Sequence, residues 1–211
     1  EKPPGLLMHP SFSRNEGTLA NYLAGYYKRT GQRCAVHPVS RLDRDTFGVV
    51  LLAKNAYVHE LMRRQHAGGG MEKTYHALTC GIPDPPEGEI DAPIARVPGD
   101  SLLREIRPDG KPASSRYRVL EARAGCAKLE LSPLTGRTHQ LRLHCAYLGC
   151  PILGDPQYGT PGSLTLSARY GIAGQQLCAV RLRFLHPMTK KTVEIRAAGD
   201  VSLDFLERTV V

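Results

Sequence analysis

The sequence has no tryptophan, only four phenylalanines, and no hydrophobic run long enough to cross a membrane. Its longest uninterrupted apolar run, residues 49–53, is far shorter than the ~20 residues that a membrane helix requires. Residues 1–5 (EKPPG) lack the basic and then apolar order of a secretory signal peptide. We therefore expect a cytoplasmic protein that does not act on a membrane.

Paired cysteine motifs are also absent. The six cysteines contain no Cys-x-x-Cys spacing, which argues against a zinc ribbon and a thioredoxin-like site. His139 and His144 are five residues apart, which is not the i, i+4 spacing of a helical metal pair. P-loop, Gly-x-Gly-x-x-Gly, Gly-x-Ser-x-Gly and His-Glu-x-x-His motifs are missing too. We expect free thiols and no metal site.

What the chain does have is positive charge. Its 211 residues carry a formal net charge of +8, and this length predicts one domain, residues 1–211. The basic excess comes from residues 1–54 (net +4) and residues 101–145 (net +5). Such a charge favours a nucleic acid as partner, then a membrane surface, although a merely solvated basic face is also common.

The hydrophobic pattern predicts an α+β fold, with a mostly antiparallel mixed central sheet flanked by helices and loops. A helix is expected over 18–29, with Thr18 as N-cap and an inward stripe of Leu19, Tyr22, Leu23 and Tyr26. Other helices are predicted over 56–66 and 138–148. Strands are predicted over 48–53 (a buried central strand), 73–80, 116–121, 128–131, and 177–185 with 191–197 as a hairpin.

Three short segments have residue types that could perform chemistry. In residues 40–48, two arginines adjoin two aspartates, which would keep a carboxylate ionised as a nucleophile or merely form a surface ion-pair turn. In residues 134–144, Gly136 is expected to open a helix with Arg137 in its first turn, which would make an anion site. Arg137, Gln140 and His144 would share one face, as in any amphipathic helix. On the strand over 73–80, Tyr75 shares a face with Lys73, and core filling is its ordinary role.

Taken in this order and spacing, these segments resemble the RluA-type family of pseudouridine synthases. The resemblance covers nearly the whole chain, and residues 134–142 followed by 149–159 are its most specific part. The other matching segments are residues 2–10, 41–46, 73–78, 110–113, 166–168 and 184–189.

The resemblance implies a pseudouridine synthase fold with a central RNA-binding cleft, and isomerisation of uridine in ribosomal or transfer RNA without a cofactor. Asp43 would be the nucleophile, on the sugar or on the base; Arg137 would keep it ionised; Tyr75 would stack on the uracil and take the C5 proton. Arg41 would help expel the uridine from its stack, because chemistry on a stacked base requires flipping. The remaining residues expected to bind the RNA are Arg44, Thr46, Lys73, Thr138, His139, Gln140, Leu141 and Arg142.

Two positions depart from the family pattern: Ser40 stands where many members have His, and Phe47 where many have Ser. Nothing resembles the small N-terminal RNA-binding domain of many relatives, so we expect a bare, probably monomeric catalytic domain. Two other hypotheses stay open, namely an RNA-binding module without catalysis and an aspartate-dependent hydrolase, in which Asp45 would have to supply a second carboxylate.

Overall fold

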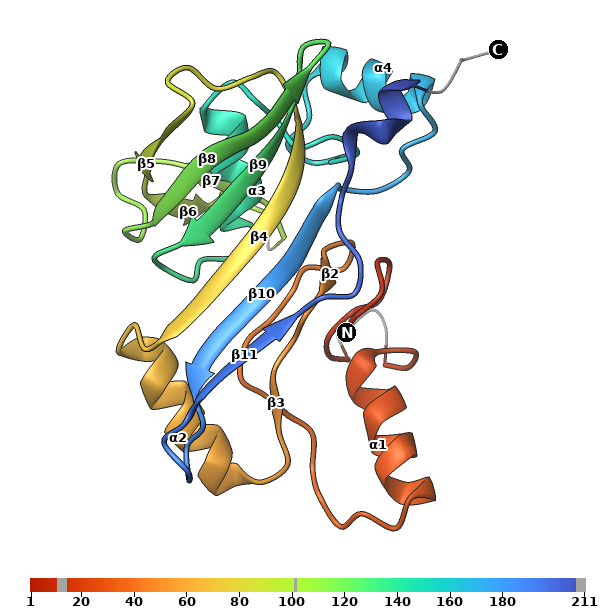
Figure 1. Cartoon of the computed structure of the whole chain (residues 1–211), viewed down its shortest axis with the longest axis vertical. Coiled ribbons are helices and arrows are strands. Elements are labelled where there is room, and N and C mark those ends of the chain that lie inside the picture. The colour runs from red at the N-terminus through yellow and green to blue at the C-terminus, as the bar shows by residue number, and fades with distance from the viewer. Residues whose placement is uncertain (11–14, 101, 208–211) are drawn as a thin grey trace. The chain divides into compact units, whose positions relative to one another are not determined.

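The computed structural model describes residues 1–10, 15–100 and 102–207 of the chain (Figure 1). It divides the chain into two compact units, which are described separately. The first unit is Glu1–Lys73 with Ala179–Ala198, and the second is Thr74–Cys178 with Gly199–Val211. The chain passes from one unit to the other inside two strands, β4 (Met71–Cys80) and β10 (Leu177–Leu185).

The first unit contains two helices and several short strands. Its complete elements are α1 (Leu19–Arg29), β1 (His37–Pro38), β2 (Phe47–Gly48), β3 (Leu52–Ala53), α2 (Ala56–Ala67) and β11 (Thr192–Arg196).

Helix α1 begins where the sequence predicts, but it buries a different face. The Thr18 hydroxyl accepts a hydrogen bond from the backbone N–H of Asn21, whose side chain binds back to the cap backbone, so both ends of a capping box are satisfied. Leu19, Leu23 and Tyr27 lie inward, whereas Tyr22 and Tyr26 are exposed. The predicted inward positions of these two tyrosines are therefore wrong, because the buried stripe continues from Leu23 to i+4 rather than to i+3.

The predicted central strand over 48–53 is also wrong. Strand β2 pairs with β10, whereas β3 pairs with β1, so the chain changes partners between them. Gly48 has a φ of +104°, and a Cβ there would collide with the backbone of Ala179. An apolar run has no period that could distinguish one long strand from two short ones.

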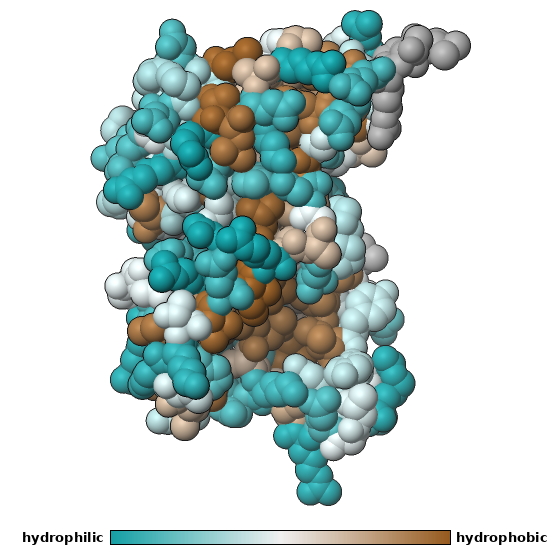
Figure 2. Space-filling model, in the orientation of Figure 1, coloured by the Kyte–Doolittle hydropathy of each residue, from teal (hydrophilic) through white to brown (hydrophobic). Residues whose placement is uncertain are grey.

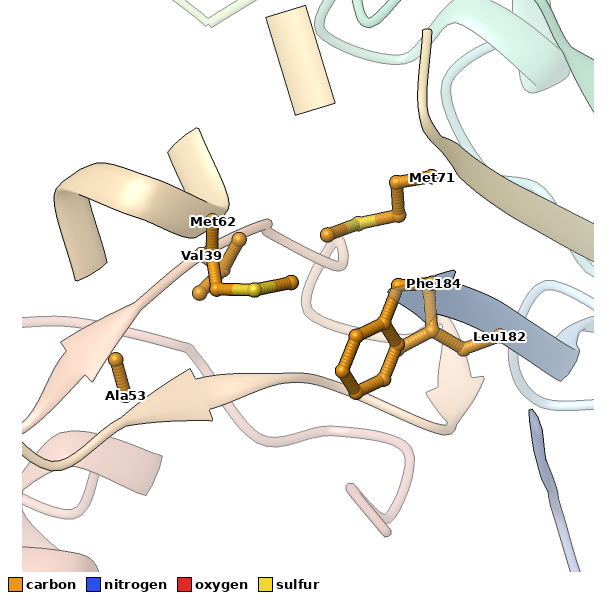
Figure 3. Packing of buried hydrophobic residues seen from close by; sticks show 6 residues of the cluster. All are labelled: Val39, Ala53, Met62, Met71, Leu182 and Phe184. Atoms are coloured by element: carbon orange, nitrogen blue, oxygen red, sulfur yellow. The ribbon is translucent and has the colours of Figure 1, made fainter. Parts of the chain in front are cut away.

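The core of the first unit is gathered around α2 and β10. Asn55 caps α2 by accepting a 2.8 Å hydrogen bond from the N–H of Val58, as predicted. Met62 of α2 packs with Phe184 of β10, and the buried cluster converges on this point (Figure 3). The cluster consists of Val39, Ala53, Met62, Met71, Leu182 and Phe184.

The predicted hairpin at the end of the chain is confirmed. Strands β10 and β11 pair antiparallel, from Arg181 with Arg196 to Leu185 with Thr192. The turn is closed by the His186 N–H, which donates to the Lys191 carbonyl at 2.8 Å.

The second unit contains an antiparallel sheet in which β4 pairs with β9 and β9 with β8, which in turn pairs with β5. The strands predicted at 73–80, 116–121 and 128–131 are confirmed as parts of β4, β8 and β9. The elements of this unit are β5 (Glu87–Asp91), β6 (Ile94–Arg96), β7 (Arg104–Ile106), β8 (Ser114–Arg123), β9 (Cys126–Pro133), α3 (Gln140–Tyr147), α4 (Pro161–Arg169) and a 3₁₀ turn at Leu203–Glu207.

The hydrogen-bonded strand order is β11-β10-β4-β9-β8-β5, with β2 joined to β10. This mostly antiparallel sheet with helices confirms the predicted α+β class. On the viewed face, hydrophobic side chains form patches among a hydrophilic majority (Figure 2). None of the helices in the described part of the chain is both long and apolar enough to cross a membrane.

Candidate active site

The candidate nucleophile lies on a loop of the first unit, residues 41–46, between β1 and β2. Leu42 and Thr46 are buried at 6% and 2% exposure and anchor this loop from below. Arg41 and Arg44 are exposed, and Asp43 between them is half-buried. The loop therefore presents the charged side chains expected to meet a polyanion.

Asp45, the second carboxylate of the loop, is held by its neighbour. The Arg44 guanidinium donates to it through Nη2 at 2.9 Å and through Nε at 3.1 Å. A carboxylate engaged in this fork is a poor candidate for a second catalytic acid. The pairing thus disfavours the hydrolase hypothesis, which requires Asp45.

The loop is supported by a residue that sequence reasoning missed. Lys2 is fully buried, and its Nζ donates to the carbonyls of Pro3, Leu6 and Arg44 at 2.9, 2.8 and 2.7 Å. Its backbone N–H and carbonyl also pair with Gly48. Lys2 therefore holds the loop at Arg44 and the strand that follows it at Gly48.

Burial lowers the pKa of Lys2 to about 8, although the charges of Asp45 and Asp43 act in the opposite direction. Three carbonyl acceptors match the three N–H donors of an ammonium group. The only sequence signal for this role was the place of Lys2 in the resemblance, since a lysine beside two prolines normally suggests a solvated end.

Lys73, expected to bind RNA, lies against α2. Its Nζ is 3.2 Å from His66 Nε2, and burial lowers its pKa to about 8. The pKa of His66 is lowered by burial and then by the charge of Lys73. Because an ammonium group only donates, His66 is a neutral acceptor here.

In the second unit, Tyr75 is buried on β4 at 8% exposure and pairs with Leu131 of β9. Strand β9 ends two residues later at Pro133. The chain then enters residues 134–139, the loop that carries Arg137. One strand pair therefore positions both Tyr75 and the start of this loop.

Helix α3 begins at Gln140, two residues later than predicted. Arg137 and Thr138 are exposed in the preceding loop, and His139 has a left-handed backbone with a φ of +58°. Because Arg137 precedes the helix, the predicted anion site in a helical first turn is wrong, and so is its shared face with Gln140 and His144. Its guanidinium Nε instead donates to the Pro112 carbonyl at 2.9 Å.

Gln140 closes this loop with its buried side-chain amide. Its Oε1 accepts from the Arg137 N–H at 2.9 Å and from the Thr135 hydroxyl at 2.7 Å. Its Nε2 donates to the Ser114 carbonyl and the Ser115 hydroxyl, both at 2.9 Å. All four bonds available to a primary amide are made.

His144 continues the same chain of hydrogen bonds. Burial lowers its pKa, so the ring is neutral, and Nε2 must carry the proton because it faces the Ala92 carbonyl at 3.1 Å. Nδ1 then accepts from the Ser115 hydroxyl at 3.0 Å. Together, Gln140, Ser115 and His144 form a neutral, directional network under the Arg137 loop.

Arg142 and Leu141 are buried, at 5% and 7% exposure. The Arg142 guanidinium makes two 2.7 Å bonds to the Asp155 carboxylate and one to Gln157, and it lies 4.9 Å from the centre of the Tyr158 ring. Tyr158 also binds His139, at 2.7 Å. Arg142 thus orders the chain around His139 rather than facing solvent.

The structure places Arg41, Asp43, Arg44 and Thr46 on one loop of the first unit, and Tyr75 and residues 137–142 in the second. Within the described residues, His, Cys, Asp and Glu side chains form no cluster of three or more that would hold a metal ion.

A family model described as RNA pseudouridylate synthase matches residues 1–147, which include Asp43, Tyr75 and Arg137. The chain is 36% identical over 196 residues to an uncharacterized RNA pseudouridine synthase, YjbO, of Bacillus subtilis; the match covers 93% of this chain and 67% of YjbO. It is 36% identical over 166 residues to ribosomal large subunit pseudouridine synthase C of Vibrio cholerae, with 79% of this chain and 52% of that protein covered.

Among solved structures, human RNA Pseudouridylate Synthase Domain Containing 4 matches 97% of this chain and 85% of its own, with a TM-score of 0.72 and 25% identity. The chain spans about half to two thirds of the length of the curated relatives named above. Sequence, family model and fold agree, and the chain belongs to the RluA-type family of RNA pseudouridylate synthases.

Proposed function

We propose that this protein isomerises uridine to pseudouridine in structured RNA, with ribosomal RNA as a better candidate than transfer RNA. The observation that carries the proposal is the loop over 41–46, which exposes two arginines around Asp43 and is held from beneath by a buried ammonium group. The name of the Vibrio cholerae relative supports the ribosomal target.

In the proposed reaction the N1–C1′ bond of uridine breaks, the uracil turns while bound, and C5 joins C1′ with loss of the C5 proton. Asp43 acts as the nucleophile, Arg137 keeps it ionised, and Tyr75 stacks on the uracil and accepts the proton. The two units act together as one catalytic domain, so that residues 1–54 and 101–145 converge on the RNA. The reaction is redox-neutral, so the protein works without a cofactor, as a monomer in the cytoplasm.

Flipping a base out of its stack costs a few kcal/mol, and contacts to phosphates offset this cost. Arg41, Arg44, Lys73, Thr138 and His139 are the residues we assign to the RNA. Thr46, Gln140, Leu141 and Arg142 are buried, and we assign them to positioning the residues around them.

The test is Asp43→Asn in a tritium-release assay with RNA labelled at C5 of uridine. We expect turnover to fall by at least about 10³-fold, as for removal of an essential nucleophile, while RNA binding is kept. Asp45→Asn is the matched control on the same loop, and we expect it to stay within about tenfold of the wild type. Retained turnover in Asp43→Asn would refute the assignment, and a wild-type chain that binds RNA but leaves uridine unchanged would instead support a binding module.

A further inference from the structure

Helix α1 shows two aromatic rings to solvent that the fold does not use. Tyr22 is 63% exposed and Tyr26 is 47% exposed, and their i, i+4 spacing puts them on one face of the helix. The packing of α1 is satisfied without them, by Leu19, Leu23 and Tyr27. Two neighbouring exposed rings on a helix are a platform on which flat groups can stack.

The same segment is uniformly basic. Residues 17–42 contain four arginine or lysine residues and no aspartate or glutamate. In the described part of the chain, Lys28, Arg29 and Arg33 form no ion pair, and all three are exposed. Helix α2 differs, because Glu60 there pairs with both Arg63 and Arg64. The surface of α1 is therefore left with a positive charge that an anionic partner can neutralise.

A hollow of about 530 Å³ opens beside Tyr22. Figure 1 shows α1 next to the N-terminal segment that forms its other wall, and the Leu19 N–H donates to the Leu7 carbonyl at 2.8 Å. This volume suits a nucleotide-sized group. The hollow is lined by Pro3, Pro4, Gly5, Leu6, Gly17, Leu19 and Tyr22.

The hollow is joined to the candidate active site through Lys2. The same ammonium group that binds the Arg44 carbonyl in the catalytic loop binds the carbonyls of Pro3 and Leu6 in the wall of the hollow. A strand of RNA that reaches Asp43 would therefore have this wall as a neighbouring surface.

We propose that Tyr22, Tyr26 and the basic end of α1 form a second RNA-binding surface, which takes unpaired nucleotides flanking the target uridine. This inference rests on the proposed function. Aromatic side chains stack on bases of any sequence, and lysine and arginine contact the phosphates between them. Only unpaired bases offer free faces for stacking, so the surface selects single-stranded RNA next to the modified position.

The experiment measures binding of a short fluorescein-labelled single-stranded RNA to the full chain by fluorescence anisotropy. We expect Tyr22→Ala and Tyr26→Ala each to raise Kd by about fivefold or more, as for loss of one stacked base. Tyr22→Phe keeps the ring and should bind like the wild type. The matched control is Tyr57→Ala on α2, which removes a ring that is 65% exposed in the same unit and should leave Kd unchanged.

Two further arms test the chemistry. Lys28→Ala with Arg29→Ala and Arg33→Ala should reduce the slope of log Kd against log salt by about 2, because each lost phosphate contact on a single strand accounts for ~0.7. A duplex of the same sequence should bind the tyrosine variants and the wild type equally.

Equal Kd values for the wild type and the Tyr22→Ala, Tyr26→Ala double variant would overturn the inference and leave this face to a protein partner. An equal loss in Tyr57→Ala would overturn it as well. The proposed function fails separately, through Asp43: a chain that never isomerises uridine, but whose tyrosine variants bind the strand more weakly, contradicts the proposed reaction and supports this surface.

Discussion

The two loops that carry the candidate catalytic residues are supported in opposite ways. Residues 41–46 are held by one buried charge, the Lys2 ammonium, which binds backbone carbonyls. Residues 134–139 are held by a network of neutral side chains built on Gln140 and His144. One support is concentrated in a single ionisable group, and the other is distributed over several groups that do not ionise at neutral pH.

This difference teaches where each loop is vulnerable. A buried amine that loses its proton loses a donor, so the first loop is sensitive to pH. In the second loop, each hydrogen bond fixes the direction of the next, so its members are coupled and the loss of one affects the others.

The largest effect is expected for Lys2→Met, which keeps the length of the side chain and removes its three donors. The carbonyls of Pro3, Leu6 and Arg44 would be left buried without partners, at about 1 kcal/mol each. We expect unfolding in urea to become easier by about 3 kcal/mol. We also expect kcat to fall by about 10²-fold, since a small misplacement of Asp43 is costly.

Lys54→Met is the control for this change, because the Lys54 ammonium is exposed and bonds only to the side chain of Gln32 in the described structure. We expect it to alter stability by less than about 0.5 kcal/mol. If the two lysine variants behave alike, Lys2 is not the support of the first loop and the contrast between the loops disappears.

A smaller effect is expected for Gln140→Leu, which removes the centre of the network in the second unit. The Arg137 N–H and the Thr135 and Ser115 hydroxyls lose a partner, and we expect a loss of about 2 kcal/mol in unfolding free energy with about a tenfold lower kcat. Gln140→Glu keeps the acceptor for Arg137 and loses only the donor, so its kcat should lie between the wild type and Gln140→Leu.

The distributed character of this network is tested by combining Gln140→Leu with Ser115→Ala. If the groups are coupled, the two changes should miss additivity by about 0.5 kcal/mol or more in urea unfolding. Strict additivity would show that the second loop is held by independent bonds.

Much of the fold was predictable because it depends on local signals. Helix α2 follows from its Asn55 cap and its apolar face, and the β10–β11 hairpin follows from its turn. Helix α4 was missed, although Thr160 caps it and Pro161 stands at its first position, because its hydrophobic stripe is weak. The break between β2 and β3 depends on the backbone of Ala179, far away in the sequence, and no local pattern could reveal it.

The candidate site was predictable as a set of residues and not as a set of environments. The motifs named Asp43, Tyr75 and Arg137, which the family match covers, but burial of Arg142 against Asp155 depends on a segment that folds back over α3. Lys2 was missed for the same reason. A charged residue in a sequence looks solvated until the fold surrounds it with carbonyls.

The last prediction concerns pH and separates the two supports. Lys2 has a folded-state pKa of about 8, below the ~10.4 of an unfolded lysine, so the folded protein releases this proton first. The contribution of this group to the unfolding free energy therefore rises as pH rises from about 8 to about 10.4. The unfolding free energy of the wild type should gain over that of Lys2→Met across this window.

Turnover should change in the opposite direction, because a neutral amine has only two N–H donors for three carbonyls and the loop around Asp43 loosens. We expect kcat of the wild type to decline above about pH 8, with the Lys2 Nζ titrating near pH 8 by NMR. Lys2→Met should lack this step, whereas Gln140→Leu should keep it, because the network of the second loop contains no group that titrates there. A step that survives in Lys2→Met would assign it to another group and would remove the distinction between a charged and a neutral support.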